Sequence, residues 1–535
     1  MQFIWFRLFV VCLLFSTALA YGISPSQFWH PAPKQRRPNI ILVVGDDIGY
    51  NDVGWHNPNM HTPFLNQLAK EGVVLENYYT YPLCSPSRAS ILTGYYAERL
   101  GLQRGVIMTQ EPYGVPLRYR MLPKRLKEAG YSTHALGKWH LGYCDWQYTP
   151  NMRGFDSFLG FYNGAEENYF HCLNRQFVLS KDNCTGLDFR DNMEIGYQYR
   201  GRYSTEIYTE RAVKIIHAHH NKNKPLFMYV ALTDSHFPLQ PPRRFLNRCK
   251  RNPNEARRKF CGAMASIDES VSNITAALKA KGLYENSIII FISDNGGATR
   301  FGASNYPLRG EKGTLWEGGT RVPAFVHSPL LKKKGYVNRR LIHATDWYPT
   351  LTRLAGLSNE YGIDGINQWD TINVNANTRR AFLPYHVDRL RNGSQIIAIR
   401  DSRYKLIAGP TGDTSRIVPE TETVDYSFNG TYFTTFVSNS TPFDYTDTRS
   451  KLYDLQEDPS ETNNLASSMP DKLRQLWNSL MEFQQRSKPA VKIPEDFAGD
   501  PEKFNYVYSP GWCRPYYDVP DTATDYTDHY YRHAY

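Results

Sequence analysis

The sequence predicts an α/β protein with a mostly parallel sheet covered by helices on both faces, followed by a smaller α+β domain with an antiparallel sheet. Up to residue 380, short apolar runs rich in β-branched residues alternate with stretches of helical periodicity, as in parallel sheets with helical crossovers. Several of these runs stop at acidic, amide or histidine residues. Beyond residue 380, strand-like segments follow one another before a single helical stretch.

Five apolar runs predict the buried strands of the larger sheet. The first, 39–44, reads Asn-Ile-Ile-Leu-Val-Val and ends abruptly at Gly45-Asp46-Asp47. Strands that are buried on both faces read as continuous hydrophobic runs of this kind. The expected strands are residues 39–44, 134–136, 225–232, 287–293 and 322–326.

Five other stretches have the spacing of amphipathic helices and lie between or beside these strands. The stretch 121–129 is followed by Gly130, a residue type that commonly ends helices. The expected helices are residues 63–71, 121–129, 204–219, 256–281 and 345–355.

Polar residues follow the predicted strands where they end. Asp46-Asp47 follows the first strand, His236 follows strand 225–232, and Asp294-Asn295 follows strand 287–293. Strand 134–136 leads into Gly137-Lys138-Trp139-His140. Ligands of open α/β sheets bind at the carboxyl ends of the strands. We therefore expect these segments, which are far apart in the sequence, to converge on one edge of the sheet.

The C-terminal part has a different texture. Residues 396–408 and 452–455 predict antiparallel strands, and a helix is expected near 470–485. Residues 410–450 are rich in Thr, Ser and Asn, and the Tyr-rich tail 505–535 has no clear pattern. The expected organisation is a signal peptide at 1–20, a catalytic domain at 21–380 and a C-terminal domain at 381–535.

The N-terminus predicts entry into the secretory pathway. Arg7 precedes a short apolar stretch that ends at Ala18-Leu19-Ala20, the pattern of a cleavable signal peptide. No later stretch reaches the ~18 apolar residues that a membrane helix needs. We expect a soluble protein with no membrane span, either lysosomal or secreted; the sequence does not separate the two.

Cysteine and glycosylation patterns fit that compartment. Of eight cysteines, Cys12 would leave with the signal peptide, and the odd number that remains requires at least one cysteine that is unpaired within the chain. We assign Cys84 as the unpaired one because of its motif. Five Asn-x-Ser/Thr triplets could carry N-glycans. The expected disulfides are Cys172–Cys184, Cys249–Cys261 and, by elimination, Cys144–Cys513; the triplets begin at Asn183, Asn273, Asn392, Asn429 and Asn439.

The net charge of +10 favours anionic partners. The sequence contains no basic helix, zinc finger or RNA-binding signature, so nucleic acid is not an expected partner. Anionic glycans and small anionic esters fit the charge equally well.

The segment Pro82-Leu-Cys-Ser-Pro-Ser-Arg-Ala-Ser-Ile-Leu-Thr-Gly94 predicts an anion site. Pro86 suits the first turn of a helix. Cys84 would then lie just before a helix N-terminus, where negative charge is stabilised. Arg88 adds a fixed cation one turn along.

This segment resembles, along its whole length, the signature of the type I sulfatases. In that family Cys-x-Pro-Ser-Arg directs oxidation of the cysteine to formylglycine by the formylglycine-generating enzyme. Residues 130–140 (GYSTHALGKWH) are similar to a second family signature, with Leu136 slightly larger than the usual residue. The resemblance continues through Asp46-Asp47, His236, 294–296, Lys312 and 451–465, and it covers nearly the whole mature chain. It implies an alkaline-phosphatase-like sandwich and a sulfuric ester hydrolase.

The resemblance also implies a site made of two groups of residues. Hard oxygen ligands from Asp and Asn suit Ca²⁺ or Mg²⁺ rather than zinc. One Ca²⁺ ion would be held by Asp46, Asp47, Asp294 and Asn295, with residue 84 as a further ligand. The expected catalytic residues are Cys84, Arg88, Lys138, His140, His236 and Lys312, of which Lys138, His236 and Lys312 would bind the substrate's sulfate.

The family chemistry assigns a task to each group. One hydroxyl of the hydrated aldehyde would attack sulfur, with Asp294 as proton acceptor, and the other would then release sulfate with help from His140. Arg88 would hold these hydroxyls, and His236 or Lys312 would protonate the leaving alcohol.

Four segments are similar to those of arylsulfatase B, the N-acetylgalactosamine-4-sulfatase: 130–142, 153–156, 236–240 and 308–319. The likeness implies an exo-acting enzyme on a terminal sulfated sugar of a glycosaminoglycan, with N-acetylgalactosamine 4-sulfate as first choice and small aryl sulfates also hydrolysed. Residues 103–118 and 164–202 lack that likeness.

Two other functions remain as alternatives. A phosphatase or phosphodiesterase of the same fold would use a Ser or Thr nucleophile and two zinc ions. A non-catalytic protein that binds sulfated glycans would be expected to have lost one of the catalytic positions, and each position named above is present.

Overall fold

The computed structural model describes most of the chain between Arg36 and Asp518. Outside it lie the expected signal peptide and the triplets at Asn183, Asn392, Asn429 and Asn439, whereas Asn273 is exposed on a helix. The chain from Pro38 onward forms one compact unit. The described residues are 36–173, 184–221, 223–250, 252, 254–358, 360–389, 395–409, 411, 416–419, 450–491 and 493–518.

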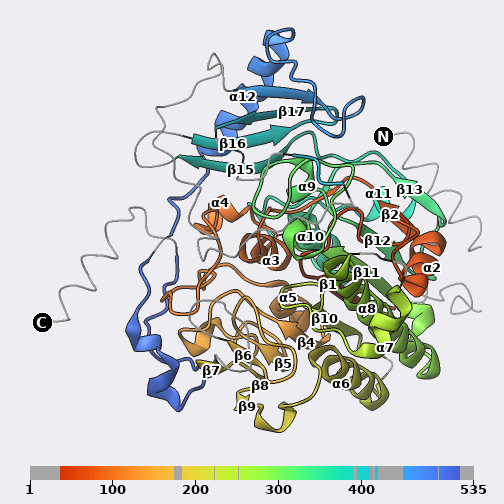
Figure 1. The fold of residues 1–535 in the computed structure, drawn as a ribbon, viewed down its shortest axis with the longest axis vertical. Coiled ribbons are helices and arrows are strands. Elements are labelled where there is room, and N and C mark those ends of the chain that lie inside the picture. The colour runs from red at the N-terminus through yellow and green to blue at the C-terminus, as the bar shows by residue number, and fades with distance from the viewer. Residues whose placement is uncertain are drawn as a thin grey trace, which may run out of the picture. The chain divides into compact units, whose positions relative to one another are not determined.

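A ten-stranded, mostly parallel sheet lies at the centre of this unit (Figure 1). Its strand order is β13-β2-β12-β11-β1-β10-β4-β5-β8-β9, and β11, β1, β10, β4 and β5 are parallel neighbours. The predicted sheet is confirmed. The strands are β1 (Asn39–Gly45), β2 (Val73–Leu75), β4 (Ser132–Lys138), β5 (Ser157–Phe161), β8 (Arg190–Asp191), β9 (Glu194–Ile195), β10 (Leu226–Leu232), β11 (Ser287–Ser293), β12 (Ala324–His327) and β13 (Tyr336–Asn338).

The side chains of β1 alternate between two hydrophobic layers. Leu42 and Val44 pack in one cluster with residues of the helices α3 (Cys84–Thr93), α5 (Leu122–Glu128) and α10 (Trp347–Leu354). Ile41 and Val43 pack in another cluster with residues of α2 (Pro63–Glu71), α6 (Ser204–Ala218) and α8 (Glu255–Ala280). All seven residues of β1 are buried, because helices cover both faces of a parallel sheet.

The predicted helices are present with small shifts at their ends. Helix 345–355 begins with a 3-10 turn, Ala344–Asp346, that continues into α10. The helices are α2 (Pro63–Glu71), α3 (Cys84–Thr93), α4 (Ala97–Leu100), α5 (Leu122–Glu128), α6 (Ser204–Ala218), α7 (Arg243–Leu246), α8 (Glu255–Ala280), α9 (Glu317–Thr320), α10 (Trp347–Leu354), α11 (Trp369–Asn373) and α12 (Pro470–Gln484).

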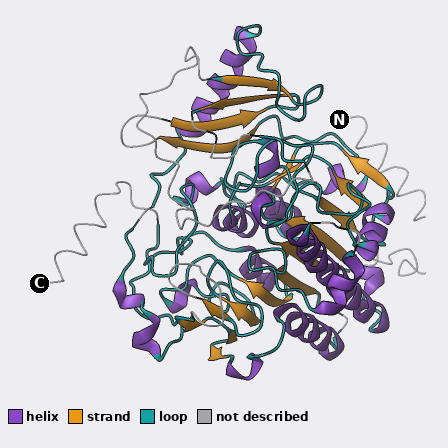
Figure 2. Cartoon of the chain, viewed as in Figure 1, coloured by secondary structure: helices purple, strands orange, loops and turns teal. Residues whose placement is uncertain are grey.

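A separate four-stranded antiparallel sheet follows (Figure 2). Its strands are β15 (Leu383–Arg389), β16 (Gln395–Arg400), β17 (Tyr404–Ala408) and β18 (Lys451–Asp454), and α12 packs on one of its faces. The antiparallel prediction is confirmed, and β15 is an additional strand. The proposed boundary at residue 380 falls just before this sheet begins.

The tail after α12 packs against segments that lie before residue 190 in the chain. The amide of Tyr508 donates to the carbonyl of Leu187, and the amide of Leu117 donates to that of Tyr516. A disulfide joins Cys144 to Cys513, and the pairs Cys172–Cys184 and Cys249–Cys261 are also formed. All three predicted pairings are confirmed, and Cys84 is a free, buried thiol.

Two short sheets complete the described strands. The pair β3 (Tyr78–Tyr79) and β14 (Ile342–His343) is parallel, and β6 (Cys172–Leu173) pairs with β7 (Gly186–Leu187).

Among the described helices, none combines the length and the apolar character that a bilayer-crossing segment requires.

Candidate active site

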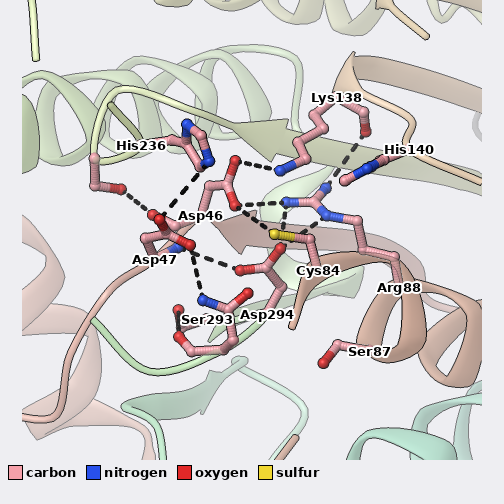
Figure 3. A network of polar contacts seen from close by, with 12 residues as sticks. Asp46, Asp47, Cys84, Ser87, Arg88, Lys138, His140, His236, Ser293 and Asp294 are labelled. Carbon is pink, nitrogen blue, oxygen red and sulfur yellow. Dashed lines mark hydrogen bonds and ion pairs between the residues drawn. The ribbon is translucent and has the colours of Figure 1, made fainter. Parts of the chain in front are cut away.

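Four parallel strands bring the predicted site residues to one edge of the larger sheet. Asp46-Asp47 follows β1, Lys138 ends β4, His236 follows β10, and Asp294-Asn295 follows β11. Figure 3 shows the side chains of Asp46, Asp47 and Asp294 gathered beside Cys84, with Lys138 reaching Asp46 and His236 facing Asp47. The predicted convergence is therefore present.

Two of these residues have a backbone conformation that side chains disfavour. Asp47 and His140 have φ values of 59° and 58°, in the left-handed region that is uncommon for residues other than glycine. Such conformations are costly and concentrate at functional sites, where the surroundings fix them.

Helix α3 presents Cys84 to the strand ends. Cys84 is the first residue of the helix, with Leu83 as N-cap, so it lies one position further into the helix than the sequence suggested. The partial positive charge of a helix N-terminus therefore acts on its side chain. Burial raises the pKa of the Cys84 thiol to about 12, so an unmodified cysteine here is a neutral thiol and a weak nucleophile.

Three buried carboxylates face Cys84. Ligand atoms of Asp46, Asp47, Asp294 and Cys84 all lie within 4.8 Å of one another. The Sγ of Cys84 donates to the Oδ1 of Asp46 at 3.6 Å. Like charges so close together in a buried site need compensation by cations.

Asn295 completes a set of hard oxygen donors. Its Nδ2 donates to the Oδ1 of Asp47 at 2.8 Å and to the carbonyl of Gly296 at 2.9 Å. Its Oδ1 is buried and has no hydrogen-bond partner, and orphaned acceptors of this kind point to an ion or another bound group. Carboxylate and amide oxygens without histidine are the donors that Ca²⁺ or Mg²⁺ prefers, so the residues fit the predicted cation.

Each carboxylate also has a basic partner within the protein. The Nζ of Lys138 lies 2.8 Å from the Oδ2 of Asp46, and the Nζ of Lys312 lies 2.7 Å from the Oδ1 of Asp47. The Nη2 of Arg88 lies 2.8 Å from the Oδ2 of Asp294. These three bases are positioned to hold an anionic group that approaches the carboxylate cluster.

The charges of the protein divide the carboxylates into two types. Burial alone would raise the pKa of Asp46, but nearby cations, Lys138 foremost, outweigh it and hold that pKa well below its ordinary value. Burial raises the pKa of Asp294 to about 6, and the neighbouring Asp46 carboxylate adds to this against the opposing charge of Arg88. Asp294 is thus the stronger base of the two.

The two histidines differ in setting. The Nε2 of His140 lies 3.0 Å from the carbonyl of Ile107 and its Nδ1 is buried without a partner. Burial, with Lys138 and Arg88 nearby, lowers the pKa of His140 well below its ordinary value. The neutral ring therefore donates through Nε2 and keeps a free lone pair on Nδ1.

His236 stands at the more open side of the site. Its Nδ1 donates to the carbonyl of Phe237 at 2.7 Å, and its Nε2 lies 3.8 Å from the Oδ2 of Asp47. Burial, followed by the charge of Lys312, lowers the pKa of His236 to about 4. Its side chain is 18% exposed and that of Lys312 is 13% exposed, whereas those of Arg88 and Lys138 are 0% exposed.

The structure adds three residues that the sequence did not indicate. The Tyr229 hydroxyl lies 3.4 Å from the Nη1 of Arg88, and the Ser85 hydroxyl donates to the carbonyl of His140 at 3.0 Å. A side chain at Gly164 would place its Cβ 2.5 Å from the Cε1 of His140. Only Tyr229 had a signal, as a residue with a polar end inside an otherwise apolar run.

A separate surface groove of about 690 Å³ lies between α6 and α8. None of the predicted site residues lines it, and its lining includes Asn273 and Glu269. We assign it no part in the chemistry, because the three buried carboxylates that face Cys84 and the unpaired atoms of Asn295 and His140 lie at the strand ends instead.

Known proteins are similar to this chain in sequence and in fold. A family model described as Sulfatase matches residues 38–357, a range that contains every predicted site residue. Arylsulfatase J of Mus musculus is 37% identical over 500 residues, which cover 89% of this chain and 80% of that protein. N-acetylgalactosamine-6-sulfatase of Mus musculus is 31% identical over 383 residues, which cover 69% of this chain and 71% of that protein.

A solved structure is similar in fold over most of the chain. The crystal structure of Ps i-CgsB in complex with k-i-k-neocarrahexaose superposes with a TM-score of 0.72 at 28% identity, covering 88% of this chain and 97% of that one.

Proposed function

The chain belongs to the sulfatase family and its reaction class is sulfate ester hydrolysis; we propose that it works with a formylglycine made from Cys84 and one bound Ca²⁺ ion. The observation that carries this proposal is the placement of Cys84 at the N-terminus of α3, against three buried carboxylates with ligand atoms within 4.8 Å. The neutral thiol of an unmodified Cys84 would be a poor nucleophile there.

The proposed cation would be held by Asp46, Asp47, Asp294 and Asn295 together with residue 84. It would supply positive charge that neutralises the nucleophile and a sulfate oxygen. The orphaned Oδ1 of Asn295 supports this set, because a buried acceptor without a partner is costly.

Residue 84, once oxidised and hydrated, would supply one hydroxyl to attack sulfur and a second whose deprotonation allows sulfate to leave. The guanidinium of Arg88, fixed by Asp294, would hold these hydroxyls in place. Asp294, whose ligand atom lies within 4.8 Å of the Cys84 sulfur, is positioned to accept the proton of the attacking hydroxyl.

The other residues would act on the sulfate and on protons. Lys138 and Lys312 present ammonium groups to the charge that develops on the sulfate oxygens. The leaving alcohol would take its proton from Lys312, which carries one in the free protein, or from His236, which is neutral there and would have to be protonated when the sulfate binds. The Nδ1 of His140 has no partner, and its lone pair would accept the proton of the second hydroxyl.

The two-zinc phosphatase alternative gains no support. The described residues contain one group of at least three His, Cys, Asp or Glu side chains close enough to hold a metal, and it includes no histidine. A catalytically inactive glycan-binding protein gains none either, because each expected catalytic position is filled and the charged groups converge.

The proposed substrate is a sulfated sugar, with terminal N-acetylgalactosamine 4-sulfate of a glycosaminoglycan as first choice. The likeness of segments 130–142 and 308–319 to arylsulfatase B supports it, and the net charge of +10 suits a polyanion. One relative's name states N-acetylgalactosamine 6-sulfate chemistry instead, so the sulfate position is the point to test. Maturation would use the formylglycine-generating enzyme in the secretory pathway, before delivery to the lysosome or secretion.

A substrate panel tests this proposal. Purified protein would be offered an aryl sulfate and 4-sulfated, 6-sulfated and N-sulfated saccharides, with Lys312→Ala as the matched impaired variant. We expect hydrolysis of the aryl sulfate and of the 4-sulfated sugar. Hydrolysis of the aryl sulfate without the 4-sulfated sugar would reject the substrate, and no hydrolysis by calcium-loaded protein that carries the aldehyde would reject the mechanism.

A further inference from the structure

A buried ion cluster joins the antiparallel sheet to the loop that carries Lys312. Lys405 extends from β17, and its Nζ lies 3.0 Å from the Oε1 of Glu317 and 2.8 Å from the Oε1 of Glu461. The Oε2 of Glu461 accepts a hydrogen bond from the amide of Glu317 at 2.7 Å. The side chains of all three residues are 0% exposed. We call these three residues the Lys405 cluster.

The short β3–β14 sheet and the antiparallel sheet both contribute to the cluster. The Tyr79 hydroxyl, from β3, donates to the Oε2 of Glu317 at 2.6 Å, and the Tyr385 hydroxyl, from β15, donates to its Oε1 at 2.5 Å. Arg400 lies 4.0 Å from the same carboxylate. Each carboxylate oxygen of Glu317 therefore accepts a hydrogen bond from one of the two tyrosine hydroxyls.

Such a cluster contributes little net stability. Taking charges out of water costs about as much as their attraction returns, and apolar residues of the same volume often stabilise a core as well or better. Fixed partners do, however, restrict the position of whatever backbone they hold. The structure shows that this backbone is residues 309–319.

The loop 309–319, whose last three residues begin α9, is held on two sides. On the side of the antiparallel sheet, the Gly310 amide donates to the carbonyl of Arg416 at 3.0 Å and the Leu315 amide to that of Thr411 at 3.0 Å. On the side of the active site, the Lys312 amide donates to the carbonyl of Gly297 at 3.2 Å. The Nζ of Lys312 then reaches Asp47 at 2.7 Å.

We propose that Lys405 is a positioning residue for sulfate binding: it fixes Glu317 and Glu461, and thereby holds the loop 309–319 where the Lys312 ammonium meets the sulfate. The antiparallel sheet then helps to position an active-site residue, although it lies outside the larger sheet. This inference rests on the role of Lys312 in the proposed function.

A double-mutant cycle separates positioning from simple stabilisation. Lys405→Met keeps an unbranched side chain and removes the charge. We expect it to lower kcat/KM by about tenfold, mainly through KM, as for coupled residues of one network. In a Lys312→Ala background the same change should cost less than about twofold, because the residue through which Lys405 acts is already gone. An equal loss in both backgrounds would overturn the proposal.

A matched control and a second variant accompany the cycle. Arg403→Met removes the ion pair of the exposed Arg403 with Asp454 of β18 (2.7 Å) and should leave kcat and KM unchanged. If Lys405→Met does not fold, Glu461→Gln keeps an acceptor for the Glu317 amide, removes the charge, and should show the same dependence on Lys312.

Amide hydrogen exchange gives a readout that needs no turnover. Amide exchange in residues 309–319 should be faster in Lys405→Met, or in Glu461→Gln, than in the wild type. Exchange in β1 should be the same in all three proteins. Unchanged exchange in 309–319 would overturn the proposal even in an active enzyme. Wild-type protein that hydrolyses no sulfate ester would instead count against the proposed function, and the exchange result would still decide this inference.

Discussion

At the scale of single residues, Asp294 is shared by the proposed cation site, the proposed nucleophile and the ion pair with Arg88. Its carboxylate lies 2.8 Å from the Nη2 of Arg88 and within the cluster that faces Cys84. Asp294→Asn should lower aryl sulfate hydrolysis by at least ~100-fold, the order expected when one electrostatic group is lost from an active site, and should lower the bound calcium measured by elemental analysis. Its far-ultraviolet circular dichroism should match that of the wild type.

The matched control for that variant is Asp268→Asn. Asp268 is also a buried carboxylate, and its Oδ1 accepts the amide hydrogen of Leu65 in α2, away from the site. It should retain activity and calcium. Full activity in Asp294→Asn would remove Asp294 from the proposed chemistry.

A second residue-scale prediction concerns Asp188, whose pKa is raised to about 6 by burial, against opposing hydrogen bonds from the amides of Tyr162 and Asn163. A carboxyl whose pKa is higher in the folded than in the unfolded state stabilises the fold below the unfolded value, and this stability is lost as pH rises through the folded value. Asp188 therefore favours the fold most near pH 4 and least above pH 6.

The measurement is the thermal unfolding midpoint of wild type and Asp188→Asn between pH 4 and 7. The midpoint of the variant should improve relative to the wild type as pH rises, because the variant lacks the ionisation that burial disfavours. A difference that does not change with pH would show that Asp188 keeps an ordinary pKa.

At the scale of elements, close contact between strands makes two glycines necessary. A Cβ at Gly160 of β5 would lie 2.0 Å from the carbonyl oxygen of Gly137 in β4, and one at Gly137 would lie 1.9 Å from that of Ala231 in β10. Gly160→Ala should push β5 from β4 and lower the unfolding free energy by about 1–3 kcal/mol, as for overpacked interiors. Urea unfolding would measure the loss, and unchanged stability would contradict this close approach.

The elements that the sequence predicted well share one property. Strands β1 and β11 are continuous apolar runs flanked by polar residues, and α2 begins with Pro63 and is followed by Gly72, so local signals mark both ends. Strands β5 and β2 carried no such signal. The first contains a glycine within its five residues, and the second has three residues. Their strand state comes from pairing with distant segments.

The site could be predicted for a similar reason, and only in part. Asp46, His236 and Asp294 each follow a recognisable strand, and the order of parallel strands brings their ends together. The Lys405 cluster and Ser85 could not be inferred, because the sequence gives no indication of which distant backbone a buried polar group will meet.

At the scale of the whole molecule, the tail after α12 is attached to the segment around Cys144 by a disulfide and by backbone hydrogen bonds. The disulfide Cys144–Cys513 spans 369 residues, and the amides of Gly511 and Trp512 donate to the carbonyl of Cys144. Replacing both cysteines by serine should lower stability by about 2–5 kcal/mol, as for native disulfides of secreted domains.

Limited proteolysis reads out that change. The first cleavage in the double-serine variant should fall within 488–518, while the same segment of wild type resists cleavage at equal protease. First cleavage elsewhere, with an unchanged unfolding midpoint, would show that backbone hydrogen bonds alone hold the tail.

The central claim is that Cys84 becomes the aldehyde that performs the chemistry, and the mass of the tryptic peptide 71–88 tests it most directly. Protein made in cells that contain the modifying enzyme should yield this peptide without the thiol sulfur and two hydrogens and with one added oxygen. The fraction converted should follow aryl sulfatase activity across preparations. Fully active protein whose peptide carries only unmodified cysteine would contradict the account.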